Sequence, residues 1–255
     1  MSKLSSQSVS QSISQSVGQP NGFFITGTDT EVGKTLISGA LILKLREQGI
    51  KAIGFKPVVA GTYRNAKGET LNEDLETLRI ASNLRSDELS LCPYVLDQPA
   101  APHLVAKHQG LKLEMGVMIE AFSDVQKHAD CLVVEGAGGL LIPLNEDEDL
   151  SDFAKAIDLP VILVVGMKLG CINHTLLTDE AIKARKLNIV GWIANGLSEE
   201  MPLLQENLQT LQARINAPFL GLIPTLPKEL QKPINSPYSI EALNFAAKHM
   251  QLPNK

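Results

Sequence analysis

The stretch Gly27-Thr28-Asp29-Thr30-Glu31-Val32-Gly33-Lys34-Thr35 decides the fold of this chain. An apolar run, Phe23-Phe24-Ile25, precedes it and a mostly apolar run, Leu36–Leu41, follows it, which predicts a strand, a loop and a helix. The Gly-Lys-Thr ending is typical of a phosphate-binding loop, whose backbone N–H groups point at an anion beside the N-terminus of the helix. The lysine adds positive charge there, and the hydroxyl of Thr35 can become a metal ligand.

The spacing within this loop is unusual. Five residues separate Gly27 from Gly33, whereas the common phosphate-binding loop has four residues between its two glycines. The alternative interpretation is a glycine-rich turn without a ligand. The strand before the loop and the helix after it favour a nucleotide phosphate site of an unusual subfamily.

Length and composition limit the classes of protein. The chain has 255 residues, 44% of them apolar, which is enough for one α/β domain with a large core. A net charge of −5 argues against broad nucleic-acid binding. Three widely spaced cysteines, Cys92, Cys131 and Cys171, fit neither a zinc site nor a disulfide framework, so we expect buried thiols in a reducing cytoplasm. No apolar run reaches the roughly 18–20 residues that a membrane-spanning helix needs.

Two regions are expected along the chain. Residues 1–20 are rich in serine and glutamine and lack the continuous apolar core of a signal peptide, so we expect a disordered extension. Residues 21–255 contain no internal repeat, and we expect them to form a single domain.

Apolar runs alternate with segments of helical periodicity over most of the chain, which predicts a doubly wound, mostly parallel sheet in a three-layer α/β/α fold of the P-loop NTPase type. We expect irregular structure at 61–70 and 92–103, and a solvated surface loop at the acidic run 146–149. The expected strands are 22–26, 52–56, 131–135, 160–166, 189–195 and 219–223. The expected helices are 34–48, 72–82, 115–127, 151–157, 173–186, 203–215 and 240–250.

Polar residues gather at the ends of the expected strands, where parallel sheets bind their ligands. Glu135 ends an almost wholly apolar strand and is a candidate Mg²⁺ ligand; the alternative is an exposed carboxylate at a strand end. Lys56 precedes Pro57 and can supply a second positive charge beside Lys34. Asp74 is a weaker candidate, because acidic residues at a helix start commonly pair with the helix dipole.

Four motifs occur together, namely GTDTEVGKT (27–35), KPVVAG (56–61), VEGAGG (134–139) and MKLGCINH (167–174). Their sequence and order resemble the dethiobiotin synthase family, and the resemblance covers about residues 22–226. It implies ATP-dependent ring closure in biotin biosynthesis. CO₂ adds to an amine of 7,8-diaminononanoate to give a carbamate, ATP phosphorylates the carbamate to a mixed anhydride, and the second amine closes a cyclic urea.

The resemblance also implies roles for matching residues, with Mg²⁺ as cofactor and ATP as co-substrate. Lys34 and Lys56 would be catalytic: Lys34 would bridge the γ-phosphate and the carbamate, and Lys56 would hold the carbamate anion. The Mg²⁺ ligands would be Thr35, Asp74 and Glu135. The residues that would bind ATP are Glu31, Val32, Gly33, Lys34, Thr35, Leu36, Asp74, Glu135, Gly136, Ala137, Gly138, Asn195, Gly196, Pro224, Thr225, Leu226 and Glu229. The residues that would contact the diamine are Thr30, Lys56, Ala60, Gly170 and Asn173.

Two parts of this substrate site differ from a simple match to the family pattern. Gly170 and Asn173 open an expected helix that, in the family, binds the distal carboxylate of a substrate in the neighbouring subunit, which implies a homodimer with shared active sites. The alternative is an ordinary helix capped by Asn173. Ala60 departs from KPVASG-type members, which have a substrate-contacting serine there; either Thr62 replaces that contact or the contact is dispensable.

Two other classes of protein carry a similar loop. Cobyrinic-acid amidases share such a loop but need a glutaminase domain, for which the chain leaves no room. Regulatory ATPases of the partitioning type usually carry an early lysine in the loop, where this chain has Asp29 and Thr30. The sequence therefore predicts a cytoplasmic ligase without a nucleic-acid or membrane partner.

Overall fold

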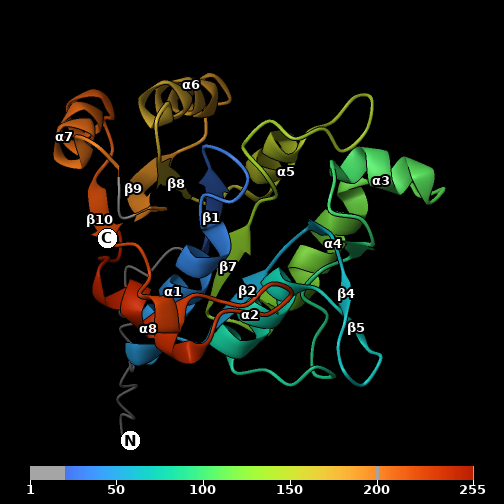
Figure 1. The fold of residues 1–255 in the computed structure, drawn as a ribbon. Coiled ribbons are helices and arrows are strands. Elements are labelled where there is room, and N and C mark those ends of the chain that lie inside the picture. Colours follow the sequence, from blue (N-terminus) through green and yellow to red (C-terminus); the bar gives the residue numbers. More distant parts are fainter. Residues whose placement is uncertain (1–20, 199–200, 255) are drawn as a thin grey trace, which may run out of the picture.

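A computed structural model describes residues 21–198 and 201–254; the extension expected at 1–20 lies outside the described residues. At its centre lies a six-stranded sheet in the order β10-β9-β8-β1-β7-β2, and every pairing in it is parallel (Figure 1). Its strands are β1 (Gly22–Gly27), β2 (Ala52–Phe55), β7 (Cys131–Glu135), β8 (Val161–Met167), β9 (Ile189–Gly196) and β10 (Phe219–Ile223).

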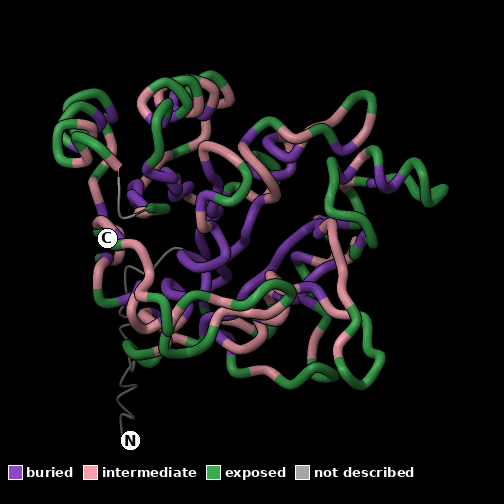
Figure 2. Tube along the Cα trace, in the orientation of Figure 1, coloured by how far each residue is buried: buried purple, intermediate pink, exposed green. Residues whose placement is uncertain are grey.

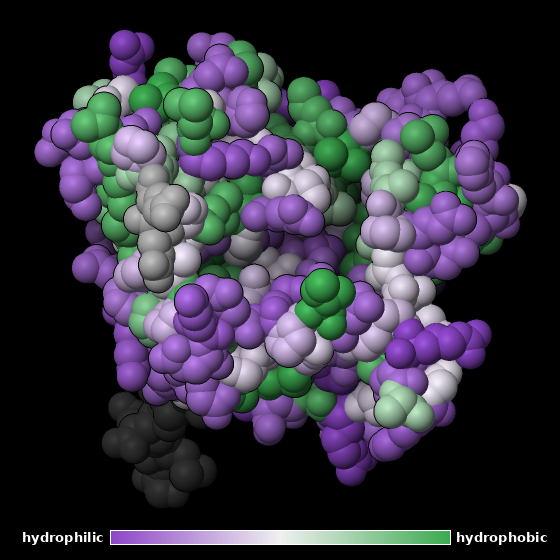
Figure 3. Space-filling model, viewed as in Figure 1, coloured by the Kyte–Doolittle hydropathy of each residue, from purple (hydrophilic) through white to green (hydrophobic). Residues whose placement is uncertain are grey.

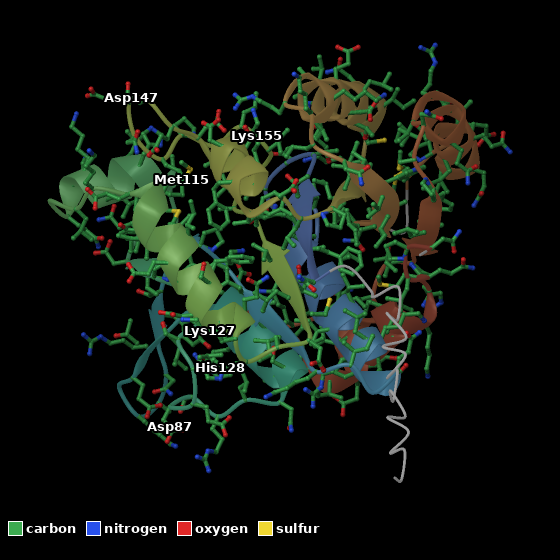
Figure 4. All side chains as sticks on the ribbon, turned by 180° about the vertical axis from the view of Figure 1, so that it is seen from behind. Asp87, Met115, Lys127, His128, Asp147 and Lys155 are labelled. Carbon is green, nitrogen blue, oxygen red and sulfur yellow. The ribbon has the colours of Figure 1, made fainter. Side chains whose placement is uncertain are left out.

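Helices cover both faces of this sheet. The chain crosses from β1 to β2 in one direction across the sheet, and from β7 through β8 and β9 to β10 in the opposite direction. Because such crossovers are right-handed, opposite directions place their helices on opposite faces. The face that carries α4 is seen in Figure 4, where Met115 and Lys127 mark the two ends of that helix. The helices of one face are α1 (Lys34–Glu47), α2 (Glu73–Ser82) and α8 (Ile240–Lys248). Those of the other are α4 (Met115–Gln126), α5 (Leu150–Ile157), α6 (Cys171–Ala184) and α7 (Leu204–Arg214). The predicted doubly wound α/β/α fold is confirmed.

The core follows the sheet, as the buried tubes at the centre of Figure 2 show. Every residue of β7 and β8 is buried, which is the pattern of parallel strands covered by helices on both sides. Helix α1 is also buried over most of its length because α2 and α8 pack on it. A Cβ atom on Gly39 would lie 2.7 Å from Leu243 Cδ2, so glycine permits the close approach of α1 and α8.

Two segments expected to be irregular contain regular structure. Strands β4 (Tyr63–Arg64) and β5 (Thr70–Leu71) form a short hairpin, and β6 (Tyr94–Leu96) pairs in parallel with β3 (Val58–Ala60). Helix α3 (Pro102–His108) follows, with proline at its first position, where the missing N–H is no loss. Strands of two or three residues are too short to show a period, and the partner of β3 lies more than thirty residues away in sequence.

Two further expectations are corrected. Asp149 belongs only partly to a solvated loop: its carboxylate accepts a 2.7 Å hydrogen bond from the N–H of Ser151 at the start of α5 and pairs with Arg185 Nη2 at 2.7 Å. Glu146 and Asp147 are exposed, as expected. Helix α6 begins at Cys171 with Gly170 as its N-cap, so Asn173 is not the capping residue.

The three cysteines are buried free thiols, as predicted. Burial raises the pKa of Cys92 and of Cys131 to about 12, which keeps both thiols protonated near neutral pH. Among the residues described, none of the helices combines the length and the apolar character needed to cross a bilayer.

Candidate active site

The predicted phosphate loop connects β1 to α1 at the middle of the sheet. Strand β1 lies between β8 and β7, whose own connections leave toward the opposite face. Loops that diverge in this way open a crevice at the carboxyl ends of the strands, which is where parallel sheets bind ligands. Figure 3, in the same view as Figure 1, shows a hollow with hydrophilic residues near the middle of the face toward the viewer.

Gly33 and Asn195 hold the loop to the sheet. Gly33 is the N-cap of α1 with φ 93°, and a Cβ atom there would lie 2.1 Å from Asn195 Nδ2. The side-chain amide of Asn195 donates a 3.0 Å hydrogen bond to the carbonyl oxygen of Val32. Only glycine tolerates both the left-handed backbone and this contact, so the end of β9 sets the position of the loop.

Four side chains predicted for catalysis or metal binding meet below the loop. The ammonium group of Lys56 lies 2.8 Å from Asp74 Oδ2 and 2.5 Å from Glu135 Oε1. Thr35 Oγ1 lies 2.7 Å from Asp74 Oδ1 and 2.8 Å from Glu135 Oε1. Since a hydroxyl group has one proton, Thr35 can donate to only one of these carboxylates at a time.

Burial makes this cluster strongly coupled. Glu135 is fully buried, which excludes the interpretation as an exposed strand-end carboxylate. Burial alone would lower the pKa of Lys56, but the charges of Asp74 and Glu135 outweigh it and raise that pKa above its ordinary value. Burial would likewise raise the pKa of Asp74, but Lys56 outweighs it and the pKa is lowered. Lys56 therefore acts as a permanent positive charge and cannot serve as a base near neutral pH.

Lys34 has a different environment from Lys56. Its ammonium group donates a 3.0 Å hydrogen bond to the carbonyl oxygen of Asp29, and the residue is buried. Burial, followed by repulsion from Lys56, lowers the pKa of Lys34 to about 8. An anion placed at the loop would relieve this repulsion and stabilise the protonated lysine.

Asp74 reaches the cluster because of Asn72, which precedes α2. The side-chain oxygen of Asn72 accepts hydrogen bonds from the N–H groups of Asp74 and Leu75, and its amide nitrogen donates to the carbonyl oxygen of Gly61 at 2.6 Å. The N-cap is thereby tied to the segment after β3, and this tie sets where the Asp74 carboxylate points. Sequence reasoning placed Asn72 at the helix start but missed this positioning role.

The cluster fits a magnesium ion. Thr35 Oγ1, Asp74 Oδ1 and Glu135 Oε1 lie close together, and Glu135 Oε2 is buried without a hydrogen-bond partner among the described residues. Magnesium typically takes one or two carboxylates and completes its shell with phosphate oxygens and water. Adjacent ligands of such an ion lie about 2.9 Å apart, which is close to the separations found here. No group of three or more histidine, cysteine or acidic residues suited to a metal occurs in the described part of the chain.

Other predicted ATP residues lie around the loop. A Cβ atom on Gly138, in the turn after β7, would lie 3.6 Å from Thr30 Oγ1, so this turn abuts the loop. A Cβ atom on Gly196 would lie 3.0 Å from the backbone nitrogen of Thr225, which brings the segment after β10 beside the end of β9. Glu229 is exposed in a short 3₁₀ helix, η1 (Lys228–Leu230).

Several predicted substrate residues are not among the hydrogen-bonded members of the cluster. Gly170 and Asn173 are exposed at the start of α6. Ala60 ends β3 half-buried, and the backbone N–H of Thr62 donates to the carbonyl oxygen of Asp97. Sequence reasoning missed one contact here, since Lys168 Nζ lies 2.9 Å from Asp29 Oδ2. The position of Lys168 in the MKLGCINH motif is the sequence signal that could have indicated this contact.

Comparison with known proteins gives a consistent result. A family model described as an AAA domain matches residues 21–232. The ATP-dependent dethiobiotin synthetase BioD of Ralstonia nicotianae is 46% identical over 80% of this chain and 89% of that protein. The enzyme of the same name from Aromatoleum aromaticum is 47% identical over 81% of this chain and 91% of that protein.

Among solved structures, the cell division ATPase MinD of Pyrococcus furiosus has a TM-score of 0.51 at 15% identity, covering 89% of this chain and 97% of that chain. This likeness shows the shared fold alone. The sequence identities extend over nearly the whole length of the curated relatives. The chain therefore belongs to the ATP-dependent dethiobiotin synthetase family.

Proposed function

We propose that this protein is a dethiobiotin synthetase that converts 7,8-diaminononanoate, CO₂ and ATP to dethiobiotin, ADP and phosphate. The observation that carries the proposal is the pair of buried lysines at the carboxyl edge of the sheet, one after β1 and one after β2, with β7 between these strands. Lys34 lies in the phosphate loop, and Lys56 forms ion pairs with the carboxylates of Asp74 and Glu135. A reaction in which a carbamate anion meets a triphosphate needs two cationic groups of this kind, because two anions repel each other.

The two lysines would divide the work. The loop amides and the ammonium group of Lys34 would hold the γ-phosphate, and Lys34 would leave the carbonyl oxygen of Asp29 to do so. Lys56 stays protonated, so we assign it to binding the carbamate and not to removing a proton. Phosphoryl transfer then depends on orientation and charge stabilisation, which are what these residues supply.

Thr35, Asp74 and Glu135 would hold Mg²⁺ in this proposal. When bound, the ion would neutralise charge on the transferred phosphoryl group. Lys56 pairs with Asp74 and with Glu135, the two carboxylates that would hold the ion, so in this proposal the lysine and the ion would share the charge of both buried carboxylates.

The base of ATP would lie between Asn195 and the segment 224–226. The support for this placement is the close approach of Gly196 to Thr225 and the resemblance of these residues to the family pattern. The amide nitrogen of Asn195 already donates to Val32, so its side-chain oxygen is the group that remains for the adenine amine.

We further propose a homodimer in which Gly170 and Asn173 serve the partner's site. Leu169, directly before them, is 99% exposed, and burial of such a side chain at a subunit interface would be favourable. The test mixes two inactive variants, Lys56→Ala and Asn173→Ala, after unfolding and refolding together. Recovery of activity toward about a quarter of the wild-type value supports shared sites, because half of the dimers are mixed and each mixed dimer has one intact site. No recovery by a mixture with native sedimentation contradicts them.

The experiment that tests the function measures ADP release by folded protein with MgATP, bicarbonate and diaminononanoate. We expect ADP release to require both the diamine and the carbon source, with dethiobiotin found by mass spectrometry. ADP release that does not depend on the diamine would contradict the proposed synthetase activity and favour a regulatory ATPase. Glutamine-dependent turnover of a different acid would favour an amidase-type ligase.

A further inference from the structure

The segment 224–239 between β10 and α8, which we call the strap, extends beyond the residues to which the proposed chemistry assigns a role. It leaves β10 at the edge of the sheet and runs toward α2, in orange to red in Figure 1. Proline has a nearly fixed φ, so several prolines restrict the backbone of the strap. These prolines are Pro224, Pro227, Pro233 and Pro237.

The first end of the strap lies at the predicted base site. Thr225 packs against Gly196, which directly follows the residue that holds the phosphate loop. Within the strap, Gln231 Nε2 donates a 2.9 Å hydrogen bond to the carbonyl oxygen of Leu226, and this bond closes the turn that contains η1. Movement of the strap near residue 231 would therefore be transmitted to Leu226.

The second end of the strap is attached to α2. Lys232 Nζ lies 2.6 Å from Glu73 Oε2 and 5.6 Å from the centroid of the Tyr238 ring. The backbone N–H of Tyr238 donates a 3.0 Å hydrogen bond to Thr77 Oγ1. Glu73 is the residue next to Asp74, so this attachment lies one residue from a proposed Mg²⁺ ligand.

Tyr238 lies near the carboxylate cluster. Burial, followed by the charges of Asp74, Glu73 and Glu135, raises the pKa of Tyr238 to about 12. Its phenol therefore stays neutral near pH 7, and its ring gives Lys232 an uncharged face to contact.

We propose that Lys232 is a positioning residue for ATP. Its ion pair with Glu73 and its contact with the Tyr238 ring clamp the strap to α2, so that residues 224–226 are held at the base site. The inference rests on the proposed function, because it assigns the base of ATP to the segment 224–226. The clamp joins the base end of the nucleotide site to the helix that carries Asp74 at the phosphate end.

The size of the effect follows from exposure. The side chains of Lys232 and Glu73 are 24% and 37% exposed, so their ion pair contributes modestly, and the contact with the ring adds a comparable amount. Losing both contacts should weaken nucleotide binding by about three- to tenfold. The diamine does not contact the strap in this scheme, so its KM should change less than about twofold.

The test compares Lys232→Met, Glu73→Gln, the double variant and Lys232→Arg, with Lys248→Met, at an exposed position of α8, as a control. Calorimetric titration with MgADP gives the Kd of each, and steady-state assays give kcat and both KM values. We expect Lys232→Met to raise the Kd for MgADP and the KM for ATP together, with kcat retained. The double variant should bind MgADP no more weakly than the single variant with the higher Kd. Lys232→Arg should bind MgADP like the wild type.

Three results would overturn the inference. Unchanged MgADP affinity in Lys232→Met would show that the clamp does not position the nucleotide. Parallel changes in kcat and in both KM values would show a merely structural role. A wild-type protein that binds no MgADP would remove the proposed function as well, whereas in the first two cases that function stands.

Discussion

The low pKa of Lys34 leads to a test that combines stability with catalysis. The perturbation is Lys34→Met, which keeps most of the side-chain volume of a buried lysine and removes its charge. In the folded protein the pKa of Lys34 falls from 10.5 to about 8, because the ammonium group is buried and lies near Lys56. At about 1.4 kcal/mol per pH unit, the charged lysine costs the native state about 3 kcal/mol at pH 7.

The sign of the pH dependence follows from proton binding. Between about pH 8 and 10.5 the unfolded chain holds a proton on this lysine that the folded protein has lost. The contribution of Lys34 to the free energy of unfolding therefore rises with pH across this window, and about two thirds of the cost has gone by about pH 9.5. The methionine variant lacks this pH-dependent contribution to the free energy of unfolding. The difference in stability between Lys34→Met and the wild type should thus shrink by about 2 kcal/mol from pH 7 to pH 9.5.

The assay is urea unfolding of both proteins at pH 7, 8, 8.5, 9 and 9.5, without nucleotide. The exposed control Lys248→Met should keep a constant difference from the wild type over the same range. A constant difference for Lys34→Met would refute the reasoning, since it would mean that burial of this lysine does not disfavour its charge. The same variant should lose turnover by at least about a thousandfold, because the phosphoryl group loses its cationic partner.

Three further predictions concern the site. Lys56→Met should lower the free energy of unfolding by about 3–5 kcal/mol, because Asp74 and Glu135 lose their shared cation, and should abolish turnover; urea unfolding and ADP release measure the two effects. Asn72→Ala should cost about 1 kcal/mol of stability and lower kcat at saturating Mg²⁺, and an unchanged kcat would contradict its role in placing Asp74. In wild-type protein kcat/KM for ATP should fall as the pH rises through about 8, because free enzyme with neutral Lys34 binds phosphate poorly; a flat profile to pH 9 would contradict this.

The sequence predicted the main sheet well, because its strands are long and apolar. Strands Cys131–Glu135 and Phe219–Ile223 have the expected bounds. The other main-sheet strands differ from expectation by one residue, at one end or, for Val161–Met167, at both ends. Structure at 58–71 and 94–108 was predicted poorly, whereas the helix between them was expected at 72–82 and lies at Glu73–Ser82. The strands β3 to β6 have two or three residues each, and the pairing of β3 with β6 depends on contacts between segments far apart in the chain.

The phosphate loop was likewise predicted only in part from the sequence. Its glycine, lysine and threonine could be recognised from local spacing, since a helix N-terminus after a strand binds an anion whatever surrounds it. The contact of Gly33 with Asn195 joins residues far apart in the chain, and no local pattern encodes it.

By itself, the sequence determined the class of fold, the loop and the residues that carry charge, because periodicity and motif spacing are local properties. The tertiary structure alone decided how those charges are partnered. It placed Lys56 between Asp74 and Glu135, set Lys34 against the carbonyl oxygen of Asp29, and joined Lys232 to Glu73. Burial and distance set the pKa of each lysine, and both arise only when separate strands and helices pack together.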